Sequence, residues 1–183
     1  MNSFCQSIGL YTHKNIDIDI NTAEVIERLR KITYPTHTTF ISLISDPAIP
    51  TRFKYRGMVY EKNFTIKKRR RFFDINLNYP VIKGSLYDQN NRTTVSTACI
   101  PSFFQIVTLV LLLGFFLVAV TVNIKNGVQD FSFIAVSALM LGTQYFVLKR
   151  EIIKGKYDFE KELDHMVQKS SNTVLHYPYS TSL

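Results

Sequence analysis

The sequence predicts an α+β fold on a membrane anchor: a small curled antiparallel sheet with one covering helix, followed by a two-helix transmembrane hairpin and a C-terminal amphipathic helix. Three observations predict it. Several segments before residue 100 alternate apolar and polar residues with the period of a half-buried strand. One segment among them has a helical period instead. No Lys, Arg, Asp or Glu occurs from Thr93 to Ile124 or from Phe131 to Leu148.

Residues 1–100 are expected to form a cytosolic α+β domain that begins with a strand and a helix. Alternating Ile and Asp residues over 16–20 are typical of a strand with one face in water. Asn21 then begins Asn-Thr-Ala-Glu, which has the spacing of a helix-capping box. Apolar residues at helical spacing follow from Val25 to Ile32, and Pro35 ends the pattern. This helix is the one expected to cover the sheet.

The remaining strands of this domain are predicted from β-branched and aromatic residues or from strict alternation. They are expected over residues 37–45, 53–62, 63–70, 73–79, 81–87 and 93–99. A polar run at 88–92 predicts a hairpin turn between the last two. Because the last strand meets the first apolar segment almost directly, we expect the sheet to lie close to the bilayer.

Two apolar segments, residues 101–123 and 131–148, predict a transmembrane hairpin. A bilayer core about 30 Å thick takes about 20 apolar residues of helix, which the first segment meets and the second approaches. Four basic residues between 149 and 156 follow the second segment, whereas the loop between the segments holds one Lys and one Asp. By the positive-inside rule we expect a multi-pass membrane protein with both termini cytoplasmic.

Residues 149–183 are expected to form a cytosolic helix and a loose tail. Gly155 is expected to separate this helix from the membrane span. Phe159, Leu163 and Met166 would then form the apolar side of an amphipathic helix. The chain has a formal net charge of +8, and most of the positive excess precedes the first span.

Two motifs ahead of the spans carry a family resemblance. They are Phe-x-Ile-x-Lys at 64–68 and Pro-x-Ile-x-Gly-x-Leu at 80–86, with Gly57 before them. The arrangement over about residues 11–167 resembles a family of small uncharacterised bacterial inner-membrane proteins with a cytosolic β-rich domain followed by a two-helix transmembrane hairpin. In place of that family's aromatic–Arg–Asn run, this sequence has Asp-Ile-Asn-Leu-Asn at 74–78. The resemblance implies a bacterial inner-membrane protein, and it brings no substrate and no catalytic residue.

The densest charge lies in the basic run Lys67, Lys68, Arg69, Arg70 and Arg71. One hypothesis is that this run contacts anionic lipid headgroups or a partner, since each basic residue near such a surface contributes about 1 kcal/mol. The alternative is a solvated hairpin end whose charge helps to orient the protein. Basic clusters also neutralise nucleic-acid phosphates, but we do not expect nucleic acid as a partner of a membrane hairpin.

Polar and small residues within the spans suggest a helix–helix contact. Gln105 and Gln144 would lie at a similar depth in an antiparallel hairpin, where they could hydrogen-bond between helices or between subunits. Ala138 and Gly142 have the small-xxx-small spacing that permits close approach. The alternative is that the two glutamines reach headgroup water.

No catalytic or cofactor motif is present in the sequence: it contains no GxGxxG, GxxxxGK[ST], HExxH or GxSxG. Glu162 and His165 form one Glu-x-x-His pair, a spacing that di-iron sites need in several copies. We therefore expect no enzymatic activity, no catalytic residue, no cofactor and no metal.

The function that remains is that of a membrane-anchored binding or scaffold module acting at the cytoplasmic leaflet. Its expected partners are the lipid bilayer, anionic headgroups, and either a second copy of the chain or an unknown membrane partner. The first alternative is an oligomeric membrane effector or small channel. The second is a membrane-bound enzyme of unfamiliar type.

Overall fold

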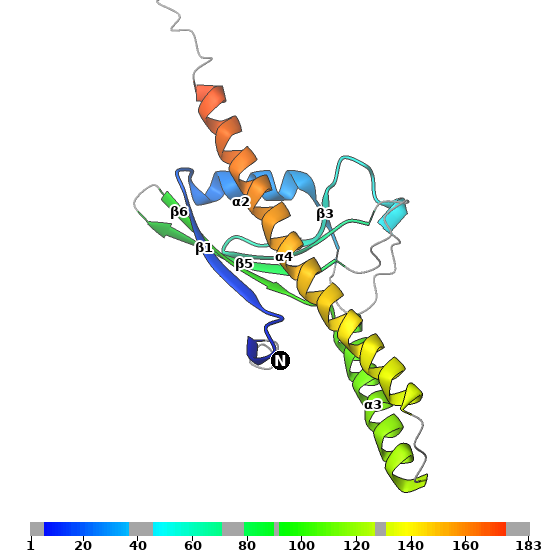
Figure 1. The fold of residues 1–183 in the computed structure, drawn as a ribbon. Coiled ribbons are helices and arrows are strands. Elements are labelled where there is room, and N and C mark those ends of the chain that lie inside the picture. The colour runs from blue at the N-terminus through cyan, green and yellow to red at the C-terminus, as the bar shows by residue number, and fades with distance from the viewer. Residues whose placement is uncertain (1–5, 37–45, 71–78, 90–91, 127–130, 175–183) are drawn as a thin grey trace, which may run out of the picture.

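The computed structural model describes residues 6–36, 46–70, 79–89, 92–126 and 131–174. In these residues a β-sheet packs against helices, and a helical hairpin projects from one end of the sheet (Figure 1). The strands are β1 (Thr12–Ile18), β2 (Thr33–Pro35), β3 (Tyr55–Val59), β4 (Asn63–Lys68), β5 (Val81–Gln89) and β6 (Arg92–Ile100). The helical elements are α2 (Thr22–Ile32), the short 3-10 helix η1 (Asp46–Ala48), α3 (Phe103–Asn126) and α4 (Ser132–Val174).

The predicted α+β fold is confirmed, but the described part of the sheet is mixed rather than antiparallel. Its strand order is β1-β6-β5-β4-β3-β2, and only the pairing of β2 with β3 is parallel. The short β2 follows α2 without a break and therefore reaches the edge beside β3 in the same direction. The expected curling is not confirmed, because β1 and β2 remain at opposite edges. Residues 37–45 and 73–78, where strands were also expected, lie outside the described residues.

The helix α2 begins as its sequence predicts. The Asn21 side chain accepts a hydrogen bond from the Ala23 backbone N–H at 3.0 Å, which satisfies one of the donors left open in the first helical turn. Val25, Ile26 and Leu29 are buried against the sheet. Capping and an apolar stripe are both local features, and for that reason this helix was predictable.

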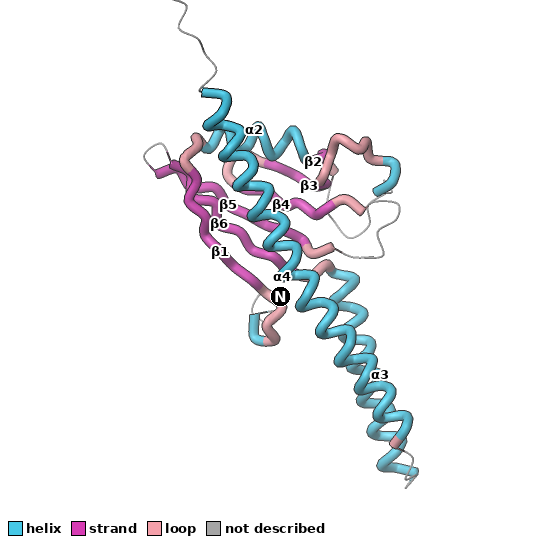
Figure 2. Tube along the Cα trace, turned by 45° about the horizontal axis from the view of Figure 1, so that its top comes forward, coloured by secondary structure: helices cyan, strands magenta, loops and turns pink. Residues whose placement is uncertain are grey.

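The prediction of one covering helix is wrong, because α2 and α4 both cover the same face of the sheet (Figure 2). The Arg28 guanidinium on α2 donates to the Met166 carbonyl oxygen on α4, which joins the two helices directly. The core that they share also takes residues from every long strand. Its members include Leu10, Ile18, Val25, Leu29, Tyr55, Phe64, Ile66, Ile82, Leu86, Val95, Ile152, Phe159, Leu163 and Met166.

The expected C-terminal helix is not a separate element, because α4 runs unbroken through Gly155. Its 43 residues span about 64 Å at 1.5 Å per residue. A Cβ at Gly155 would lie 2.4 Å from Pro80 Cγ, so glycine at this position lets α4 approach the chain just before β5. Close approach, rather than a helix break, is therefore the role of this glycine.

The hairpin helices α3 and α4 are each long and apolar enough to cross a membrane. Small side chains mark their mutual contact, since Ala119 and Ser137 are each 1% exposed. The Phe115 and Phe133 rings meet edge to face with centroids 5.4 Å apart. The buried and half-buried positions of α3 include 105, 109, 112, 116 and 119, which alternate in steps of four and three as in a left-handed helix pair.

Two glycines of the motif region are required by close packing. Gly57 has a φ of 147°, and a Cβ there would lie 2.1 Å from the Thr65 carbonyl oxygen on the neighbouring strand. A Cβ at Gly84 would lie 2.1 Å from the ring of Phe64. Phe64 thus fills the space that a side chain at residue 84 would need, and so brings an aromatic ring into the centre of the core.

Candidate functional site

The register of the strands places the basic run at the end of the sheet from which the hairpin begins. Ile100, the last residue of β6, lies opposite Val81, the first of β5. Val81 lies opposite Lys67, and Lys68 lies opposite Tyr55. These ends of β3, β4, β5 and β6 therefore form one end of the sheet, near the start of α3 (Figure 1).

Alternation along β4 divides the run between the two faces. Because Ile66 is buried under the helices, Lys67 points to the opposite face, beside Arg56. Burial and the positive charge of Arg56 lower the pKa of Lys67, and the Asp46 carboxylate opposes this shift. Arg56 itself is paired with Asp46 at 2.5 Å.

The next residues of the run make contacts within the protein. Lys68 pairs with Asp158 on α4 at 2.6 Å. The Arg69 guanidinium donates to the Ile49 carbonyl oxygen, and the Arg70 backbone N–H donates to an Asp46 carboxylate oxygen at 3.0 Å. Arg71 lies outside the described residues. Lys68 thus holds α4 to this end of the sheet, and Arg69 holds the segment around η1 to it.

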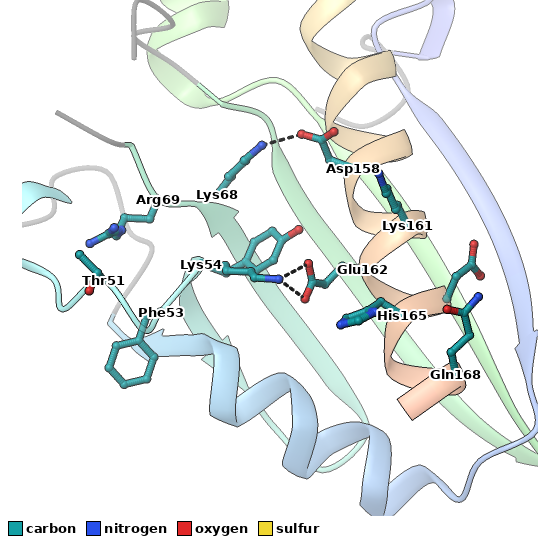
Figure 3. Close-up of a pocket in the computed structure, with 12 residues that line it drawn as sticks. Thr51, Phe53, Lys54, Lys68, Arg69, Asp158, Lys161, Glu162, His165 and Gln168 are labelled. Carbon is teal, nitrogen blue, oxygen red and sulfur yellow. Dashed lines mark hydrogen bonds and ion pairs between the residues drawn. The ribbon is translucent and has the colours of Figure 1, made fainter. Parts of the chain in front are cut away.

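A cleft of about 610 Å³ opens between α4 and this end of the sheet (Figure 3). Lys54 crosses it and pairs with both carboxylate oxygens of Glu162 on α4, at 2.7 and 2.8 Å. The pair of Lys68 with Asp158 also lies in the cleft. Phe53 lines the side opposite α4, and Lys161 and His165 line the α4 side.

Tyr55 lies at the base of the cleft and is only 4% exposed. Its ring meets Phe159 edge to face with centroids 6.1 Å apart. The hydroxyl makes no hydrogen bond to another described residue, although it borders the cleft. Burial raises the pKa of this phenol well above its usual value, and the carboxylates of Glu162 and Asp158 add to the effect. Tyr55 therefore stays a neutral hydrogen-bond donor at the cleft.

Glu162 and His165, the Glu-x-x-His pair of the sequence, both line this cleft. Lys54 already occupies both oxygens of the Glu162 carboxylate. No group of three His, Cys, Asp or Glu side chains suited to a metal ion occurs among the residues with described positions.

Gln105 has a local role at the start of α3. Its side-chain oxygen accepts a hydrogen bond from the Ser102 backbone N–H at 2.7 Å, while its own backbone N–H donates to the Ser102 carbonyl oxygen at 3.0 Å. The side-chain bond is one half of a capping box; the other half is not formed, because the Ser102 hydroxyl makes no hydrogen bond to a described residue. Gln144 is half-buried on α4.

The small residues Ala138 and Gly142 do not carry the contact between α3 and α4. Ala138 is exposed, and a Cβ at Gly142 would meet no atom within 4 Å. Ser137 and Ala119 fill the contact instead. The predicted contact of Ala138 and Gly142 remains a prediction about neighbouring chains.

Lys68 and Arg69 of the cleft belong to the predicted basic run, but the cleft itself was not predicted from the sequence, and only a weak signal pointed to its acidic residues on α4. Asp158 and Glu162 are four residues apart and so share one face of a helix. Their partners Lys68 and Lys54 come from distant strand ends, and nothing in the sequence pairs them. Comparison with known proteins found no matching family model and no curated protein of significant similarity.

Proposed function

We propose that this protein is an integral membrane protein of the bacterial inner membrane, and that its α+β domain is a binding or scaffold module held at the cytoplasmic leaflet. The observation that carries the proposal is an apolar hairpin whose side chains face outward and which is joined rigidly to the domain.

The exposure of the hairpin supports the membrane location. In each helix only 11% of the most apolar stretch is buried. The core helix of a soluble protein would be mostly buried, and a signal sequence would lie near the N-terminus rather than after residue 100. Large exposed apolar side chains occur along both helices, including Phe104, Leu111, Leu117, Val122, Phe133, Leu139 and Phe146. A lipid environment explains this surface better than water does.

Three connections support a domain that is held in place rather than tethered loosely. Only Pro101 and Ser102 separate β6 from α3. The helix α4 continues from the hairpin into the core without interruption. The Tyr145 hydroxyl, near the domain end of the apolar part of α4, donates to the Ile8 carbonyl oxygen at 3.0 Å. The domain is therefore expected to keep one orientation relative to the bilayer.

Charge supports a cytoplasmic domain. Lys149, Arg150 and Lys154 follow the apolar part of α4 within a few residues. Cytoplasmic flanks of spans are enriched in such residues. The basic run adds to this charge, but Asp158, to which Lys68 is bound, lies about 15 Å along α4 from Leu148. We propose that the hairpin is held at a tilt toward this side, which brings the run to the anionic headgroups.

Single-cysteine labelling of the full chain tests the location and the orientation. In a background with Cys5→Ser and Cys99→Ala, Lys125→Cys should react with a membrane-impermeant maleimide on intact cells. The matched Lys154→Cys should react only after permeabilisation, because it lies on the domain side. Equal labelling of both before permeabilisation, or release of the chain by alkaline carbonate, would contradict the proposal.

Hydrogen exchange of the full chain in nanodiscs tests the lipid contact. Backbone amides at residues 67–70 should be better protected when phosphatidylglycerol is added to phosphatidylcholine. Arg70→Gln should reduce this gain, whereas Arg92→Gln, at the opposite end of the sheet, should leave it unchanged. No gain with the anionic lipid would contradict the headgroup contact. Ion conductance by the chain in liposomes would instead favour a small channel over a scaffold.

A further inference from the structure

We propose that the cleft between α4 and the neighbouring ends of β3 and β4 binds a small organic anion that carries a carboxylate or phosphate group. This inference rests on the proposed role as a binding module and names the chemical class of its ligand.

The charge of the cleft favours an anion. Four basic side chains line it, Lys54, Lys68, Arg69 and Lys161, against three carboxylates, Asp158, Glu162 and Asp164. Two of those carboxylates are already paired with Lys54 and Lys68. Among the described residues, Arg69 and Lys161 form no ion pair, and neither does the third carboxylate, Asp164, so the unpaired groups of the cleft carry one net positive charge. His165 lines the same space and adds a further donor when it is protonated.

Arg69 is held in position before any ligand arrives. Its backbone N–H donates to the Lys54 carbonyl oxygen at 2.9 Å, and one guanidinium nitrogen donates to the Ile49 carbonyl oxygen. A guanidinium has five N–H donors, so most of them remain for a ligand. A planar fork of this kind binds the two oxygens of a carboxylate or phosphate group well.

Tyr55 provides a further donor for a ligand. The residue lines the cleft, and its ring is buried. Its hydroxyl forms no hydrogen bond to another described residue, and it is not one of the buried side-chain atoms that lack a partner. It can therefore donate to an anionic oxygen in the cleft.

The lysines of the cleft can join the ligand without a large cost. The Lys54 side chain is 53% exposed and that of Lys68 is 38% exposed. Ion pairs of such exposed groups contribute little, so an added anion can share these lysines with their present carboxylate partners.

The size of the cleft favours an organic anion over a bare inorganic one. Its volume of about 610 Å³ lies in the range of small-molecule sites, about 300–1,000 Å³. The Phe53 ring provides an apolar wall opposite α4. The ligand therefore needs an organic part that contacts Phe53 and an anionic group that binds basic side chains lining the cleft.

Calorimetric titration of the full chain in neutral detergent micelles tests the inference. The probes are inorganic phosphate, citrate and adenosine monophosphate. We expect citrate or adenosine monophosphate to bind more tightly than inorganic phosphate. Lys161→Gln and Tyr55→Phe should each weaken that binding about tenfold, the effect of losing a hydrogen bond to a charged group. Lys83→Gln removes the same charge from the exposed surface of β5 and should leave the Kd unchanged.

Three results would overturn the inference: no heat of binding with any probe at 10 mM, roughly the weak limit for a specific site; equal weakening by Lys83→Gln, which indicates general charge attraction; or unchanged binding by both cleft variants. Thermal unfolding of each variant confirms that it is folded.

The source of the anion is distinguished in nanodiscs. If the natural ligand is a lipid headgroup, added phosphatidylglycerol should compete with the soluble probe, and Lys161→Gln should abolish that competition. If it is a soluble molecule, the lipid should not change the Kd. Failure to bind in micelles leaves the labelling result on location and orientation intact, so the two proposals fail separately.

Discussion

Replacement of Phe159 by alanine tests the finding that α4 belongs to the core of the domain. Phe159 is 1% exposed, and its ring packs on those of Phe64 and Tyr55 at centroid distances of 5.6 and 6.1 Å. Truncation of a buried Phe to Ala costs about 3–5 kcal/mol, because apolar contact is lost and a cavity remains. Domains are typically stable by about 5–15 kcal/mol, so the loss is a large fraction of the total.

The matched control is Tyr157→Ala, on the same helix and two residues earlier. Tyr157 is 65% exposed, and surface substitutions of this kind usually change stability by no more than about 0.5 kcal/mol. Both variants place alanine in the same helix, so differences in helix propensity nearly cancel. The difference between them therefore reports the burial of Phe159.

Native-state hydrogen exchange of the full chain in neutral detergent micelles provides the measurement. Amides of β4 and β5 should exchange with an opening free energy lower by about 3 kcal/mol or more in Phe159→Ala than in Tyr157→Ala. Amides in the middle of α3 should change much less, because the hairpin does not depend on this contact. A difference between the variants below about 1 kcal/mol would refute the assignment of α4 to the core.

Three further outcomes are expected. Gly155→Ala should destabilise the domain although alanine favours helices, because its Cβ would lie 2.4 Å from Pro80 Cγ. The control Gly142→Ala should not destabilise it, because a Cβ there would meet no atom within 4 Å. Thermal unfolding of the two variants compares these effects. Gly57→Ala should prevent normal pairing of β3 with β4, seen as rapid amide exchange in β4, since its φ of 147° and its contact with the β4 backbone exclude a side chain. Burial raises the pKa of Cys99 to about 11 from 9.0, so its contribution to stability is complete below pH 9 and is lost as the pH rises toward 11. The free energy of unfolding, measured with urea, should fall over that window by about 3 kcal/mol at most, and by less in Cys99→Ala.

Most elements of the domain were predictable because their signals are local. Alternating Ile and Asp residues mark β1, and Asn21 marks the start of α2. The apolar segments mark the hairpin helices by composition alone. Parallel pairing of β2 was not predictable, because a strand of three residues has too short a pattern to indicate its neighbour or direction.

The candidate site shows the opposite case. Lys54 and Glu162 are 108 residues apart in the sequence, and they meet only because α4 packs across the sheet. The basic run looked like one surface patch, yet strand alternation sends Lys67 to one face, while Lys68 turns to Asp158 on the other. A charge count cannot distinguish a solvated lysine from one that is paired within the fold.

The sequence by itself determined where the apolar helices lie, where α2 begins and which residues alternate along the strands. These features depend only on neighbours within one helical turn or one strand, so they do not require contacts between distant segments. Only the tertiary structure decided that α4 is a single helix shared by the hairpin and the core, and that a charged cleft lies beside it. Both depend on close approach between distant segments, such as Gly155 against Pro80, which no local pattern records.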